Sequence, residues 1–140
     1  MSDQYNRDFY AWASEQAALL RAGNLSAADI ANIAEEIDSM GRSEKRELVN
    51  RLAVLLTHLL KWEHQPERLS RSWHLSLREQ RREVADVLAD NPSLRDRLGD
   101  LLADAYGKAL LAAQRETGLP EETFPAACPW SFEQAMQDGP

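Results

Sequence analysis

The sequence contains a single cysteine, Cys128, which excludes an intrachain disulfide and favours a reducing compartment. It has no run of about 18 apolar residues, the length that a membrane-spanning helix needs. The first eight residues include no apolar stretch and do not resemble a secretion signal. The six glycines are scattered, so no glycine-rich phosphate loop is present. We therefore expect a cytoplasmic protein without a membrane segment.

The alternation of polar and apolar residues that is typical of a half-buried strand is also missing, whereas apolar residues recur at helical spacing along the whole chain. A chain of 140 residues is one domain of ordinary size. The sequence thus predicts a single all-α domain over residues 1–140, a compact bundle of five to six helices. The expected helices cover about residues 7–22, 27–40, 44–64, 71–89, 92–117 and 131–137.

Glycine and proline punctuate these helices. Gly23 and Gly118 stand where a helix commonly ends in a left-handed residue. Pro66 stops the third helix, because a proline ring clashes with the preceding turn. Asn91 followed by Pro92 predicts the start of the fifth helix, with a capping side chain and a proline at the first position.

Two apolar stripes predict buried helix faces. The stripe of the longest helix is formed by Leu48, Leu52, Leu55, Leu59 and Trp62. The stripe of the second helix is formed by Ile30, Ile33, Ile37 and Met40. Ser26 with Asp29 resembles a capping box that opens this second helix, and Gly41 with Ser43 predicts a break between the two helices.

The segment from Leu119 to Trp130 contains three prolines among bulky hydrophobic residues. Disordered segments are poor in phenylalanine and tryptophan, so we expect an ordered strap over the bundle. Ser131 and Gln134 then predict the start of a short last helix.

The net charge of −7 is unevenly distributed. Residues 1–40 include two basic and seven acidic residues, residues 41–82 ten basic and five acidic, and residues 83–140 four basic and eleven acidic. The simplest interpretation is that the basic middle packs beside its acidic flanks. The alternative is a site for an anion or a partner on the middle segment.

Four segments point to a known family: Tyr5–Trp12, Ile37–Glu44, Leu59–Arg68 and Glu116–Pro120. The motifs Ser70–Trp73, Arg78–Arg81, Phe124-Pro125 and Cys128–Trp130 extend the likeness over nearly the whole chain. In this order they resemble an uncharacterised bacterial family, domain of unknown function family twenty-nine. The resemblance implies an all-helical, stand-alone cytoplasmic domain, and it brings no activity and no catalytic residues.

All three histidines and two of the four tryptophans fall between His58 and Arg82, around the expected hinge at Pro66. We expect a non-catalytic protein-interaction module in which tryptophans supply apolar area and arginines bind a carboxylate-bearing protein or an anionic ligand. The candidate recognition surface is Trp62, His64, Glu67, Arg68, Arg71, Trp73, His74 and Arg78. The structural alternative is that both tryptophans are core anchors and that the arginines pair with acidic residues such as Glu35, Glu36 or Asp38.

Two other functions compete with this hypothesis. A small enzyme or a metal-binding protein would use a site around His58, His64 and His74, but only His64, Glu67 and His74 across the hinge could share an ion, and their spacing is no recognised ligand pattern. We expect no metal or cofactor. Cys128 has no cysteine or histidine near it in sequence and is interpreted as a structural thiol.

A nucleic-acid-binding accessory domain would use the arginines near the tryptophans, namely Arg68, Arg71, Arg78, Arg81 and Arg82. The isoelectric point of about 5 and the acidic Glu79, Glu83 and Asp86 on the same helix weigh against it. Self-association through a helix face is a further alternative.

Overall fold

The computed structural model describes residues 4–137, and over this range the chain is helical without strands, which confirms the all-α prediction. Six α-helices follow one another: α1 (Gln4–Arg7), α2 (Phe9–Arg21), α3 (Ile30–His64), α4 (Ser72–Asp90), α5 (Leu98–Thr117) and α6 (Phe132–Met136). Three short 3₁₀ helices lie between them: η1 (Pro66–Arg68), η2 (Pro92–Arg97) and η3 (Glu121–Thr123).

The longest helix, α3, continues through Gly41 and Ser43, so the predicted break between helices at 27–40 and 44–64 is wrong. Gly41 does not adopt a positive φ. A glycine inside a helix costs about 1 kcal/mol, and here the good helix formers around it outweigh that cost. The predicted start is also wrong: the helix begins at Ile30, and the Ser26 hydroxyl donates to Asn24 Oδ1 at 3.1 Å.

The chain divides into two compact units, Met1–Ser43 and Glu44–Pro140, which are described separately. The buried apolar core of the bundle lies in the second unit. The two short helices and the beginning of α3 in the first unit offer few facing surfaces for a core of their own.

The first unit contains α1, α2 and the beginning of α3, and it has few buried residues. Trp12 and Gln16 are its buried side chains among the described residues. The Trp12 indole donates to Asp29 Oδ2 at 3.0 Å, and Gln16 Oε1 accepts from the Asp29 backbone N–H at 2.7 Å. These bonds attach α2 to the start of α3. Gly23 adopts a φ of +72° just beyond the end of α2, which confirms the prediction for this position.

The apolar stripe of α3 in this unit does not form a buried face. Ile30, Ile37 and Met40 are 52%, 63% and 68% exposed. The spacing of the stripe is that of an amphipathic helix, and only Ile33 of its four members is half-buried. The hydrogen bonds of α1 and α2 to this part of the chain are made at Glu36, by Tyr5 of α1, and at Asp29 before α3, by Trp12 of α2. The prediction that these side chains are buried is wrong for the described structure of the unit.

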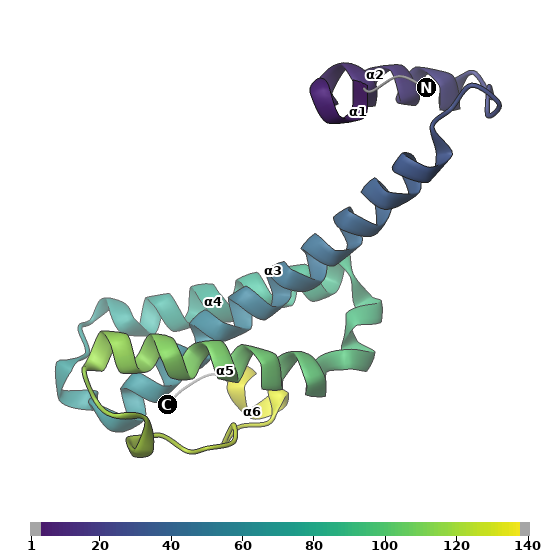
Figure 1. Ribbon diagram of the computed structural model, residues 1–140. Coiled ribbons are helices and arrows are strands. Elements are labelled where there is room, and N and C mark those ends of the chain that lie inside the picture. Colours follow the sequence, from purple (N-terminus) through teal and green to yellow (C-terminus); the bar gives the residue numbers. More distant parts are fainter. Residues whose placement is uncertain (1–3, 138–140) are drawn as a thin grey trace. The chain divides into compact units, whose positions relative to one another are not determined.

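The second unit is a bundle in which the end of α3, α4 and α5 lie side by side around a leucine core (Figure 1). The predicted stripe of α3 is confirmed, since Leu48, Leu52, Leu55 and Leu59 are buried. Each buried leucine contributes about 1.5–3 kcal/mol to folding. This core fixes α3 and α4 on both sides of the hinge at Pro66.

The predicted helix ends in the second unit are mostly confirmed. Helix α3 ends at His64, two residues before Pro66. Gly118 adopts a φ of +76° at the end of α5. The start at Asn91-Pro92 is different: a 3₁₀ helix covers Pro92–Arg97, and α5 begins only at Leu98. A 3₁₀ turn is common at an α-helix N-terminus, and the cap and proline pattern does not distinguish it from an α-helix.

The carboxyl-terminal segment packs against this bundle. Phe124 is buried, and Leu119, Cys128 and Trp130 contact the core cluster. The Tyr106 hydroxyl of α5 donates to the Pro125 carbonyl. The segment leads to α6, which begins after Ser131 as predicted, and the side chains of Ser131 and Gln134 form a capping box there.

Candidate functional site

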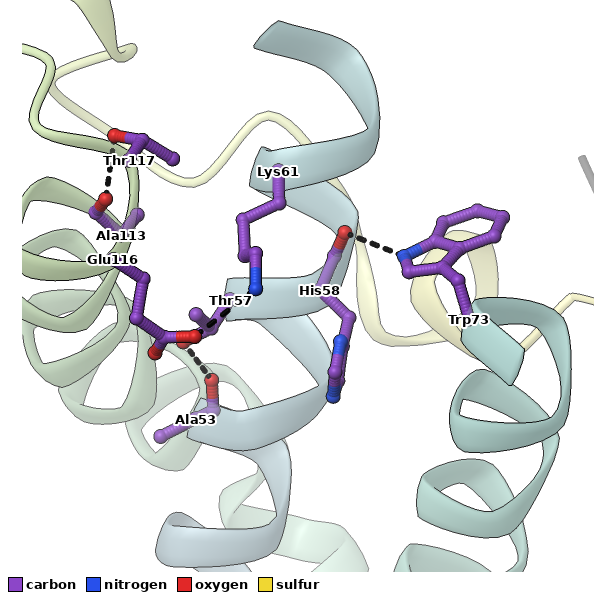
Figure 2. Close-up of polar contacts among 8 residues, drawn as sticks. All are labelled: Ala53, Thr57, His58, Lys61, Trp73, Ala113, Glu116 and Thr117. Atoms are coloured by element: carbon purple, nitrogen blue, oxygen red, sulfur yellow. Dashed lines mark hydrogen bonds and ion pairs between the residues drawn. The ribbon is translucent and has the colours of Figure 1, made fainter. Parts of the chain in front are cut away.

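The hinge between α3 and α4 places the two tryptophans of the predicted surface against each other. The rings of Trp62 and Trp73 stack with centroids 6.1 Å apart and planes 16° apart. Trp73 is only 6% exposed, and its Nε1 donates to the His58 carbonyl at 3.3 Å (Figure 2). Trp62 is half-buried against the core. Trp73 therefore holds the first turn of α4 on α3, as the structural alternative expects of a core anchor.

The arginines of the predicted surface are exposed. Arg71, Leu75, Arg78 and Arg82 follow one another at spacings of four, three and four, so they share one face of α4. Arg68 of η1 is exposed as well, and Leu75 is 65% exposed. We call these five residues the arginine surface. Within the described part of the second unit, none of its four arginines is in an ion pair.

Arg81 lies on the neighbouring, buried face of α4, with Leu77 and Val84. It is 7% exposed, and its Nε donates to the Ala135 carbonyl of α6 at 3.0 Å. A buried arginine needs such partners, because an unpaired buried charge is strongly destabilising. Arg81 therefore attaches α6 to α4. Of the five arginines that a nucleic-acid-binding surface was expected to use, Arg81 is the one that is buried and not available for binding.

A cavity of about 300 Å³ opens at the hinge beside the arginine surface. It is bounded on one side by Lys61, whose Nζ is 3.0 Å from Glu116 Oε1 of α5 (Figure 2). His58 also lines it, and burial together with the nearby Lys61 charge lowers the pKa of this histidine. At neutral pH His58 is therefore an uncharged imidazole whose Nδ1 is buried without a hydrogen-bond partner.

The three histidines have different surroundings. The His64 ring packs edge-on against Phe124 at 5.0 Å, whereas the exposed His74 packs edge-on against Trp73 at 4.8 Å. Glu67 is exposed on η1. Over residues 4–137, no three His, Cys, Asp or Glu side chains come together as a metal site requires. The small-enzyme hypothesis around His58, His64 and His74 stays a prediction.

Cys128 has the surroundings of a structural thiol. Burial raises its pKa, and its Sγ donates to the Trp130 carbonyl at 3.3 Å. A nucleophilic cysteine needs the opposite, a lowered pKa and a base beside it.

The helical spacing of α4 identifies two residues of the arginine surface that the predicted recognition surface left out. Leu75 and Arg82 were not part of that prediction, although the four-three-four spacing from Arg71 places them on the same face. The burial of Trp73 and Arg81 has a signal of the same kind, because both lie with Leu77, Val84 and Leu88 at spacings of three and four on the buried face of α4. The spacing does not predict their hydrogen-bond partners, which α3 and α6 supply.

In the part of the chain that is described, each helix is too short or too polar to cross a membrane. No curated protein and no solved structure matches the chain. The family model described as "Domain of unknown function DUF29" matches residues 4–139, almost the entire length. The resemblance that the sequence motifs carry is thereby confirmed, and the chain belongs to the DUF29 family.

Proposed function

We propose that this protein is a non-catalytic interaction module of the bacterial cytoplasm that binds a carboxylate-bearing segment of a partner protein through its arginine surface. The observation that carries the proposal is the row of exposed arginines on α4 without ion pairs inside their own unit. By comparison, Arg51 of α3 bonds Glu47 of its own helix at 2.8 Å.

The chemistry of the row fits a peptide segment. A guanidinium binds a carboxylate through two parallel hydrogen bonds, which adds direction to the charge attraction. Each exposed pair contributes only about 0.2–1 kcal/mol, so several must act together. Leu75 stands between Arg71 and Arg78 and offers an apolar contact in the middle of the charges. A helix with acidic residues around one or two leucines complements this face.

Nucleic acid fits the surface less well. The whole chain has a net charge of −7, and Glu79 is exposed directly beside the arginine row. Binding of the phosphate backbone needs an extended basic patch, and base stacking needs exposed aromatic rings. Trp73 is buried and Trp62 is half-buried, so neither ring is free on both faces.

In this proposal Trp73 has a structural role and is not a contact residue. Trp73 positions the arginines by fixing the start of α4, and it does not contact the partner. The contact residues are therefore Arg68, Arg71, Leu75, Arg78 and Arg82.

A binding experiment with a matched control tests the proposal. The probe is a fluorescein-labelled peptide with leucines and glutamates at helical spacing, and binding to the full chain is followed by fluorescence anisotropy. We expect the double variant Arg71→Ala/Arg78→Ala to bind about tenfold more weakly, since two charge contacts are lost. The control Arg95→Ala/Arg97→Ala removes two exposed arginines of η2 and the same total charge, and it should bind almost normally.

Two results would overturn the proposal. If both double variants lose the same affinity, the peptide senses only the overall charge. If a labelled single-stranded oligonucleotide binds in place of the peptide and depends on Arg71 and Arg78, the nucleic-acid alternative is correct.

A further inference from the structure

The first unit exposes most of its apolar side chains. Of the ten large hydrophobic side chains that are exposed in the described residues, seven belong to it: Phe9, Tyr10, Leu20, Leu25, Ile30, Ile37 and Met40. Soluble proteins usually expose such residues singly, and a group of them on one small unit marks an interaction surface.

Part of this group forms a row along α3. Ile30, Ile37 and Met40 are seven and three residues apart, the spacing of the side chains that contact a partner helix along one seam. Neither α1 nor α2 covers the row, because its three side chains are 52%, 63% and 68% exposed. Tyr5 of α1 bonds Glu36, and Trp12 of α2 bonds Asp29 just before α3. One flank of α3 is therefore available to a further helix.

The charge of the unit decides what kind of helix fits. Met1–Ser43 contains three basic and seven acidic residues, a net charge of −4. Asp38 is exposed next to Ile37, and Glu35 is exposed although it pairs with Arg42 at 3.2 Å. A second copy of this unit would bring equal negative charge to the seam, and like charges across an interface disfavour association. A helix with leucines on one face and lysines or arginines beside them complements the seam in both shape and charge.

We infer that the row of Ile30, Ile37 and Met40, with its acidic rim, is a docking site for a basic amphipathic helix of a partner protein. This site is separate from the arginine surface, which has the opposite charge. The chain would then carry two interaction surfaces on two units, an acidic and apolar one before Ser43 and a basic one on α4.

The test uses a fluorescein-labelled peptide with leucines and lysines at helical spacing, added to the full chain and followed by anisotropy. The variant Ile37→Ser/Met40→Ser should bind about tenfold more weakly, because two apolar contacts are lost. Both side chains are exposed, so this variant should keep the wild-type melting temperature. The control is Val54→Ser/Leu111→Ser on the second unit, whose side chains are 40% and 66% exposed and belong to neither proposed surface, and it should bind like wild type.

Two further measurements separate this inference from the proposed function and from self-association. The leucine and glutamate peptide should bind the Ile37→Ser/Met40→Ser variant as it binds wild type, so either proposal can fail without the other. Multi-angle light scattering of wild type should give the same mass at low and high concentration. Equal binding of the basic peptide to both serine variants would overturn the inference, and so would a wild-type dimer that the Ile37→Ser/Met40→Ser variant dissociates, because the seam would then bind a second copy.

Discussion

Truncation of Trp73 distinguishes a core anchor from a contact residue. Its side chain is 94% removed from solvent, stacks on Trp62 and donates to the His58 carbonyl. Replacing a buried tryptophan by alanine costs about 3–5 kcal/mol, which is a large part of the 5–15 kcal/mol that stabilises a domain. Trp73→Phe keeps most of the apolar area and loses one hydrogen bond, which costs about 1 kcal/mol. We therefore expect wild type to be the most stable, Trp73→Phe less stable and Trp73→Ala the least stable. Urea unfolding followed by far-ultraviolet circular dichroism measures these free energies of unfolding.

The control for this series is Leu75→Ala, two residues further along α4. Leu75 is 65% exposed, so its truncation should change the free energy of unfolding by less than about 0.5 kcal/mol. The reasoning would be refuted if Trp73→Ala unfolded at the wild-type urea concentration and lost binding of the acidic peptide. Trp73 would then contact the partner directly, as the predicted recognition surface has it, and would not be a core anchor.

Two further predictions concern His58 and the end of α5. Burial lowers the pKa of His58 below its ordinary 6.5, so protons bind the unfolded chain more readily, and stability should fall as the pH drops below 6.5 towards the folded-state pKa. In His58→Gln the loss of stability between pH 7 and 5, measured by urea unfolding, should be smaller than in wild type, and an equal loss would contradict the assignment. Gly118 has a φ of +76°, so Gly118→Ala should destabilise the protein by about 1 kcal/mol. The control Gly107→Ala lies in the middle of α5, where an added Cβ meets no atom within 4 Å, and it should raise the melting temperature. A rise for both variants would refute the argument from φ.

Local signals in the sequence predicted much of the fold. Pro66, Gly23 and Gly118 mark helix ends that the structure confirms, because proline and left-handed glycine restrict the backbone whatever surrounds them. Gly41 is the counterexample. A glycine in ordinary helical geometry is tolerated when its neighbours favour a helix, so its presence alone does not end α3.

Burial was predicted well where a helix lies inside the bundle and poorly elsewhere. The leucine stripe of α3 meets α4 and α5, and its members are buried as expected. The stripe of Ile30 and Ile37 has the same period, but periodicity predicts only an apolar face and does not say which element covers it.

The sequence located the region of the candidate site, but it did not say which of its side chains are exposed. Arg68, Arg71 and Arg78 are exposed, whereas Trp73 is a buried contact of α3. The difference between Arg78 and the buried Arg81 is one of helix face, and it depends on the carbonyl that α6 offers to Arg81. The spacing of α4 indicates the buried face, since Arg81 lies four residues after Leu77 and three before Val84, but it does not reveal the carbonyl that Arg81 bonds.

The central claim is that the arginine surface binds carboxylates. It is tested most directly by nuclear magnetic resonance of the arginine Nε–Hε groups while the acidic peptide is added to the full chain. The account predicts that the Arg71 and Arg78 signals shift with increasing peptide and that the Arg81 signal, from a side chain bonded to Ala135, does not. Unchanged Arg71 and Arg78 signals, or equal shifts of all exposed arginines, would contradict it.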